Sequence, residues 1–217
     1  MEATSSGGYL TQMQYALEHF GVAVAAVTGV LAARGKQVDL FGVIVLAVVT
    51  AFGGGTLRDL LVGDLPVIWV RDANFLLNAV GVGFCTFFVA RVREFPRMVL
   101  LVADAFALAL FTEIGVRKAL AFGVAPSVAV AMGVITGVAG GIMRDLLTGE
   151  IPLVFRREIY LYATAALCGA TVVVWLVRTP LAEPLQMVAG VGVTLVLRLV
   201  GIRWRLALPV FRPRDGR

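Results

Sequence analysis

The chain has 217 residues, of which 59% are hydrophobic, and its mean hydropathy is +0.92. Soluble domains are about 45–50% apolar, so this composition excludes an ordinary soluble protein and predicts an integral membrane protein. The net charge of +5 lies in short runs between long apolar segments, a pattern that indicates helical spans rather than nucleic-acid binding or a β-barrel.

Seven segments are apolar enough to cross a bilayer, for which about 20 residues are needed. In chain order they are residues 12–33, 38–62, 73–92, 97–117, 123–148, 158–177 and 184–203. Turn signals separate them, such as Gly63-Asp64-Leu65-Pro66 after the second and Gly149-Glu150-Ile151-Pro152 after the fifth. The sequence therefore predicts one all-α membrane domain over residues 1–217, with seven transmembrane helices and a short basic tail at 204–217.

The distribution of basic residues predicts the orientation in the membrane. Seven spans place the two termini on opposite sides. The loops on one side hold four Lys or Arg residues, and the loops on the other side hold twelve. Cytoplasmic loops carry the excess of positive charge, so we expect the N-terminus outside and the C-terminus in the cytoplasm.

An internal duplication relates the two halves of the chain. At an offset of 86 residues, positions 48–66 and 134–152 share ten identities in nineteen. The repeats cover about 12–92 and 97–177, and a seventh helix at 184–203 lies outside them. Each repeat has an odd number of spans, so the second copy enters the membrane from the opposite face. Two inverted three-helix repeats are typical of proteins that move solutes.

Each repeat carries small residues followed by arginine and aspartate late in a span. The two copies are Gly53, Gly54, Gly55, Arg58 and Asp59, and Ala139, Gly140, Gly141, Arg144 and Asp145. A glycine weakens a helix by about 1 kcal/mol relative to alanine, but it also permits close helix packing, and both interpretations stay open. A buried arginine costs about 2.5–3.5 kcal/mol, so we expect both arginines to face the protein interior or water, unless they reach the headgroups as anchors.

Other polar residues in the spans are candidates for the same site. We expect two ion pairs, Glu18 with Arg58 and Asp104 with Arg144, because each pair occupies matching positions in the repeats. The pairs would form two charged constrictions of an hourglass pathway. Thr50 and Thr136 either line this pathway or bond to the backbone carbonyl one turn earlier. For Lys118, anchoring at the membrane surface and a gating role both remain open.

The two motif copies and their surroundings resemble a known family. Residues 54–63 and 140–149 both read Gly-Gly-x-x-Arg-Asp-x-x-x-Gly, and Leu40-Phe41-Gly42-Val43 is similar to bacterial members. The chain is identified as a member of the trimeric intracellular cation channel family, in its prokaryotic branch. The resemblance implies a homotrimer in the bacterial inner membrane. It also implies one pore per subunit, kinked at the glycines of the second and fifth helices, which passes potassium and sodium ions without a cofactor.

The sequence also bears on three alternatives to a channel: an enzyme, a transporter and a scaffold. The chain has one histidine, His19, and no motif of a catalytic or metal site, so an enzyme is not indicated. Some bacterial relatives are described as glycine transporters, and inverted repeats suit alternating access equally well. A third alternative is a membrane scaffold whose glycines serve only packing.

Overall fold

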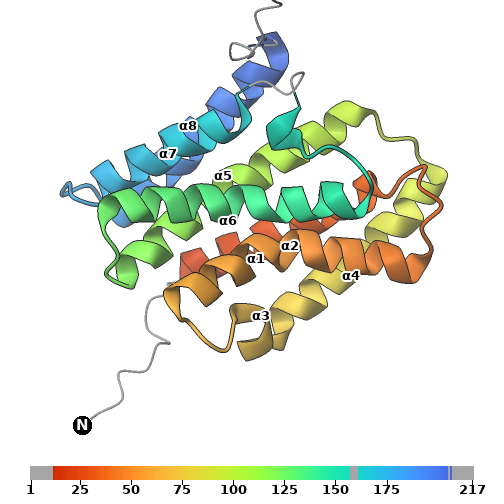
Figure 1. The fold of residues 1–217 in the computed structure, drawn as a ribbon, viewed down its shortest axis with the longest axis horizontal. Helices are drawn as coiled ribbons and strands as arrows, with labels where there is room; N and C mark the ends of the chain where they lie inside the picture. The colour runs from red at the N-terminus through yellow and green to blue at the C-terminus, as the bar shows by residue number, and fades with distance from the viewer. Residues whose placement is uncertain (1–11, 157–160, 205, 207–217) are drawn as a thin grey trace, which may run out of the picture.

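The computed structural model describes residues 12–156, 161–204 and 206, and this part of the chain is helical. Figure 1 shows the helices packed as one bundle. Its longer helices are α1 (Gln12–Ala32), α2 (Leu40–Val62), α4 (Ala73–Val92), α5 (Arg97–Ala121), α6 (Pro126–Leu147), α7 (Tyr162–Leu176) and α8 (Glu183–Trp204). The short helices α3 (Ile68–Arg71) and η1 (Leu153–Phe155) follow α2 and α6.

The long helices follow the predicted spans closely. Within the described residues, six of them are long and apolar enough to cross a membrane, and α7 is a shorter apolar helix of 15 residues. The first residues of the predicted sixth span lie outside the described residues. Most of the tail predicted at 204–217 also lies outside them. Helix α5 continues to Ala121, four residues beyond its predicted end. Neither α3 nor η1 was predicted, because so short a helix has no hydropathy signal.

Capping residues define where α2 and its repeat partner α6 begin and end. The Asp39 side chain accepts a hydrogen bond from the Gly42 backbone N–H, and Pro126 occupies the first turn of α6. The chain leaves the two helices through Gly63 and Gly149, which have φ values of 76° and 69°. This left-handed conformation favours glycine, and the two glycines are separated by the repeat offset of 86 residues.

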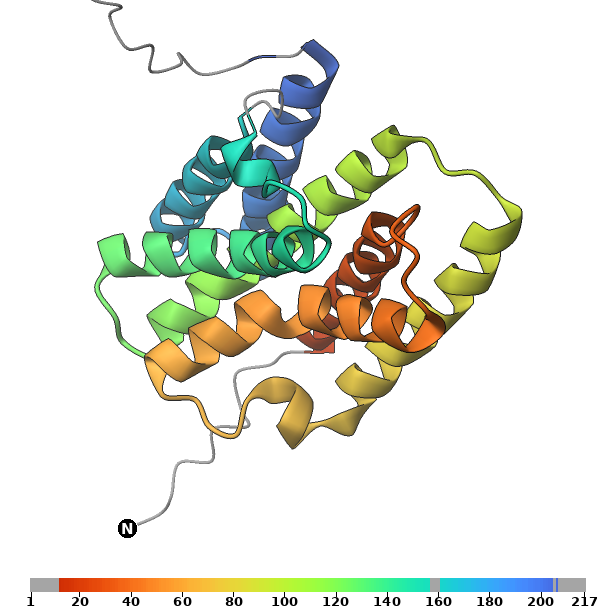
Figure 2. The ribbon, with the colours of Figure 1, turned by 45° about the vertical axis from the view of Figure 1, so that its right-hand side comes forward.

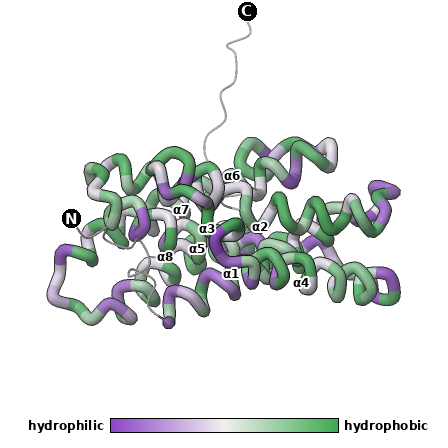
Figure 3. The backbone as a smooth tube through the Cα atoms, turned by 90° about the horizontal axis from the view of Figure 1, so that it is seen from below, coloured by the Kyte–Doolittle hydropathy of each residue, from purple (hydrophilic) through white to green (hydrophobic). Residues whose placement is uncertain are grey.

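Successive long helices alternate in direction through the bundle (Figure 1). Helices α2 and α6 lie side by side near its centre and run in opposite directions (Figures 1 and 2). Hydrophobic stretches occupy the middle of the helices, and many of the hydrophilic segments lie in the turns at either end (Figure 3). This distribution is the one expected of helices that cross a bilayer.

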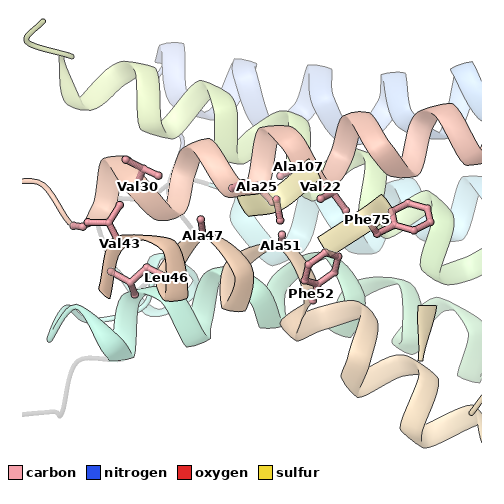
Figure 4. Packing of buried hydrophobic residues seen from close by; sticks show 13 residues of the cluster. Val22, Ala25, Val30, Val43, Leu46, Ala47, Ala51, Phe52, Phe75 and Ala107 are labelled. Carbon is pink, nitrogen blue, oxygen red and sulfur yellow. The ribbon is translucent and has the colours of Figure 1, made fainter. Parts of the chain in front are cut away.

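Small residues let the helices of the first repeat approach closely. Ala25, Ala47 and Ala51 are almost fully buried between α1 and α2, and Phe52 and Phe75 close one end of this core (Figure 4). Lipid tails are as apolar as the helix surfaces, so such contacts depend on close van der Waals packing.

The closest approach joins α2 to α6 through backbone atoms. A Cβ atom on Gly54 would overlap the carbonyl oxygen of Thr136, and one on Gly140 would overlap the carbonyl oxygen of Thr50. The two contacts are equivalent under the repeat, because Gly54 and Gly140, and likewise Thr50 and Thr136, are 86 residues apart. The Thr50 and Thr136 hydroxyls donate hydrogen bonds of 2.6 Å to the carbonyls of Leu46 and Met132, one turn earlier, as one of the two interpretations predicts.

Two alanine substitutions in the same motif should therefore have opposite effects. Gly54→Ala forces apart two backbones and should lower the free energy of unfolding by about 1–3 kcal/mol. Gly55→Ala is the matched control, because the nearest atom to its new Cβ is Arg58 Nη2 at 3.8 Å. It should raise stability by about 0.5–1 kcal/mol through helix propensity. Thermal unfolding of the detergent-purified protein checks both values, and equal effects of the two substitutions would contradict this packing.

Candidate functional site

The last turns of α2 hold a buried network of ionic side chains. Arg58 is 1% exposed, and its Nε and Nη2 both lie 2.8 Å from Asp59 Oδ1. Lys118, from the end of α5, places its Nζ 2.8 Å from the same oxygen and 2.7 Å from Asp64 Oδ2. Arg71 binds the other oxygen of Asp64 at 2.7 Å. Each of these cations is thus neutralised within the protein.

The last turns of α6 hold the matching network. Arg144 is fully buried and binds Asp145 Oδ1 through Nε and Asp104 Oδ1 through Nη1, both at 2.8 Å. The second oxygen of Asp145 accepts a hydrogen bond of 2.8 Å from the backbone N–H of Leu153. In the first repeat, Asp59 Oδ2 accepts one of 3.4 Å from the N–H of Ile68. The motif aspartate therefore holds both the arginine beside it and the chain that returns after the helix.

One of the two predicted ion pairs is present and the other is not. Asp104 binds Arg144 as expected. The prediction that Glu18 pairs with Arg58 is wrong, because within the described residues Arg58 forms its ion pair with Asp59 instead. The adjacent aspartate reaches the guanidinium directly. Glu18 still lies close enough to Arg58 and Lys118 to interact electrostatically with them.

Lys118 and the motif arginines do not act as anchors at the membrane surface. Lys118 is 9% exposed and its ammonium group lies between two buried carboxylates, while both arginines are enclosed by protein. The anchoring interpretation is therefore wrong for all three side chains, because neutralising partners inside the protein remove the need to reach water.

Among the buried carboxylate oxygens of the described residues, two have no hydrogen-bond partner of good geometry, although the Tyr162 side chain lies close enough to Asp104 to interact with it. They are Glu18 Oε2 and Asp104 Oδ2, on residues that are 5% and 4% exposed. Glu18 lines a cavity of about 20 Å³ together with Arg58, and Asp104 lines one of about 10 Å³ beside Thr50, Thr136 and the glycine crossing. Across the described residues, no three His, Cys, Asp or Glu side chains gather as a metal site.

The motif glycines have different surroundings. Gly54 and Gly140 form the crossing, whereas a Cβ atom on Gly53 would press on the flexible side chain of Met143. A Cβ atom on Gly141 would lie 3.1 Å from the Tyr162 hydroxyl. The helical hydrogen-bond pattern of α2 continues without a break from Leu40 to Val62.

Arg198 of α8 was not among the residues predicted for the site. This arginine is fully buried, its guanidinium carbon lies 4.7 Å from the centre of the Tyr162 ring, and its charge interacts with Asp104. The seventh long helix therefore contributes a cation to the network at the end of α6. The position of Arg198 inside the predicted span 184–203 could have identified it, since an arginine inside an apolar span needs a partner within the protein.

Comparisons with known proteins agree with this arrangement. A family model described as "Glycine transporter" matches residues 15–91 and 101–178, which correspond to the two predicted repeats. The chain is 46% identical to the inner membrane protein YadS of Escherichia coli strain K12, over 91% of this chain and 95% of that one. The crystal structure of a trimeric intracellular cation channel orthologue from Rhodobacter sphaeroides is 41% identical, with a TM-score of 0.85, over 90% of this chain and all of that one.

The chain belongs to the trimeric intracellular cation channel family. A second structure of this family, described as the structural basis for conductance through such channels, is 30% identical with a TM-score of 0.83. It covers 93% of this chain and 98% of its own. The resemblance seen in the two motif copies is thus confirmed at the level of family and fold.

The bridge from Lys118 to Asp64 makes a prediction about acid stability. Burial alone would raise the pKa of Asp64. Hydrogen bonds from Lys118 and Arg71 outweigh this effect, so the pKa of Asp64 lies below its ordinary value of 3.8. A lowered pKa in the folded protein stabilises the fold above pH 3.8, and this contribution is lost as pH falls through the lowered value. In Lys118→Met, one of the hydrogen bonds that lower the pKa of Asp64 is missing, so this pKa should be higher. The stabilising contribution should then begin to be lost at a higher pH.

Unfolding temperature measured against pH tests this expectation. Lys36→Met is the matched control, because Lys36 pairs with Glu150 at an exposed site, where the ion pair contributes little. An identical pH profile for Lys118→Met and the wild type would show that Lys118 does not hold the Asp64 carboxylate.

Proposed function

We propose that the protein is a cation channel with one pore per subunit, and that the pore follows the interface between its two repeats. The observation that carries this proposal is a pair of buried carboxylates that each line a small cavity, Asp104 at the α2–α6 crossing and Glu18 beside Arg58. A permeant cation needs oxygen ligands that partly replace its hydration shell. The relatives of known structure, which are cation channels, support the same function.

The pairing of the arginines explains how cations could pass beside them. Asp59 and Asp145 neutralise Arg58 and Arg144 from the adjacent position in the chain. Glu18 would supply a carboxylate at one end of the pathway and Asp104 one at the other. Potassium would be the main ion, with sodium also admitted, as the family resemblance implies.

The inverted repeats proposed for the pore have three lines of support. The family model matches both segments, α2 and α6 run in opposite directions, and Gly54 and Gly140 make reciprocal contacts with Thr136 and Thr50. An axis through this crossing would exchange the two halves, with α8 outside the duplication.

The cavities at the crossing support a closed conformation. A water molecule needs about 10–15 Å³ of such space, so the central cavity of about 10 Å³ is too small for a hydrated ion. Opening would separate α2 from α6, with bending at Gly53–Gly55 and Ala139–Gly141. Release of Lys118 from Asp59 and Asp64 would free the end of α2 for this movement.

The assembly would be a homotrimer in the bacterial inner membrane. Similarity to trimeric channels and to an inner membrane protein supports this setting. The excess of basic residues supports an external N-terminus and a cytoplasmic C-terminus.

Secondary transport of glycine is the second candidate function, favoured by the description of the matching family model. A site with both carboxylates and guanidinium groups would suit a small zwitterion. Single-channel recording in planar bilayers distinguishes the two candidates. Unitary potassium currents far above transporter turnover support the channel, whereas saturable glycine uptake without such currents overturns it.

Removal of the negative charge of Glu18 or of Asp104 should reduce potassium conductance. Glu18→Gln and Asp104→Asn should each lower the unitary conductance about two- to tenfold, because a fixed negative charge concentrates cations along the pathway. Glu94→Gln is the control, since Glu94 is 95% exposed and pairs only loosely with Arg34 at 3.4 Å. Wild-type conductance in both buried variants would place the pore elsewhere.

A further inference from the structure

A large cavity opens at the end of the bundle where α1 begins and α5 ends. Its volume is about 550 Å³, which lies within the range of small-molecule sites in proteins. The cavity is bounded by α1, α3, α5, the start of α4, the end of α7 and the start of α8. It is far larger than the cavity at the crossing and the one beside Arg58, and it shares Glu18 with the latter.

Among the ionic side chains around this cavity, one carboxylate forms neither an ion pair nor a hydrogen bond with the described residues, and interacts with Arg58 and Lys118 only at longer range. Three cations and four carboxylates line it: Arg71, Arg117 and Lys118, and Glu18, Asp72, Glu113 and Glu183.

All of them except Glu18 have close partners. Arg71 binds Asp64, Lys118 binds Asp59 and Asp64, and Arg117 binds Glu113 and Glu183. Asp72 accepts hydrogen bonds from the Tyr15 hydroxyl and the Asn74 backbone N–H. Glu18, which is 5% exposed, keeps Oε2 without a hydrogen bond among the described residues. Glu18 is thus the one carboxylate of this wall without a close partner, and the residue through which the wall can attract a positively charged ligand.

The remaining wall is mostly apolar. Ile68, Phe75, Ile114 and Leu120 supply much of it. A bare metal ion gains nothing from such a wall, whereas an organic group gains about 25 cal/mol for each Å² of apolar surface that it buries. Charge and wall together favour a ligand with an ammonium group at one end and a hydrocarbon chain at the other.

We propose that this cavity binds organic primary ammonium ions, with the ammonium group on Glu18 and the hydrocarbon chain against the apolar wall. The site itself does not depend on conduction. If the proposed pore is correct, the bound ligand occupies its entrance, because the step from the large cavity towards the crossing passes Glu18. Such a ligand then blocks the channel.

Calorimetric titration of the detergent-purified protein with hexylammonium tests the site without any current. Hexylammonium should bind at least about tenfold more tightly than hexanol, which has the same chain without the charge, and than methylammonium, which has the charge without the chain. Equal affinity for hexanol and hexylammonium would reveal a cavity for lipid or detergent chains and would overturn the proposal.

Two variants locate the ligand. Glu18→Gln should weaken hexylammonium binding at least about tenfold and leave hexanol binding unchanged, while Glu94→Gln should alter neither. Ala121→Trp fills the cavity from its edge and keeps every charge, so it should weaken both ligands. This second variant keeps the proposal testable if Glu18→Gln does not fold. Unchanged binding of hexylammonium to Ala121→Trp would place the ligand outside the cavity.

Block of potassium current is measured separately, with hexylammonium added to one side of the bilayer at a time. Binding without block from either side contradicts a pore entrance at this cavity and leaves the binding site in place. A wild-type protein that binds hexylammonium but carries no current contradicts the channel function alone. Absence of binding overturns the site, whatever the currents show.

Discussion

The backbone contact between α2 and α6 is the constraint on which the rest of the structure depends. Gly54 and Gly140 allow each helix to touch a threonine carbonyl of the other, and any larger side chain would separate them. Each glycine weakens its helix by about 1 kcal/mol, and close packing at the crossing offsets that cost. The antiparallel crossing also places the motif charges of α2 and α6 towards opposite ends of the bundle (Figure 1).

Burial of the motif arginines is tolerated because each has an aspartate as its neighbour in sequence. Asp59 and Asp145 also hold backbone N–H groups of the chain that follows, so the ionic network and the return of the chain depend on each other. Lys118 and Arg198 add a further cation to each end. Because Asp59 and Asp145 neutralise the arginines, the charges of Glu18 and Asp104 are not the only ones that offset them.

The two sides of the crossing differ despite the repeat. The end near Glu18 opens into a cavity of about 550 Å³, whereas the end near Asp104 is covered by Tyr162 and Arg198. Helix α8, which has no counterpart in the first repeat, contributes Arg198 to this difference, and Tyr162 at the start of α7 contributes the rest. A pathway with one wide entrance and one covered end would respond differently to ligands added from the two sides of a membrane.

The sequence determined the long helices and their order, because hydropathy, caps and turn residues act locally, and it determined the duplication through the offset of 86 residues. It also identified Arg58, Arg144 and Asp104 as interior residues, since a charge in an apolar span needs a partner. Only the tertiary structure decided which partner each charge takes. Asp59 rather than Glu18 neutralises Arg58, Lys118 spans two carboxylates, and Arg198 enters from a helix outside the repeats. The physical reason is that ion pairing depends on distances of about 3 Å between side chains far apart in sequence, and helix packing fixes those distances.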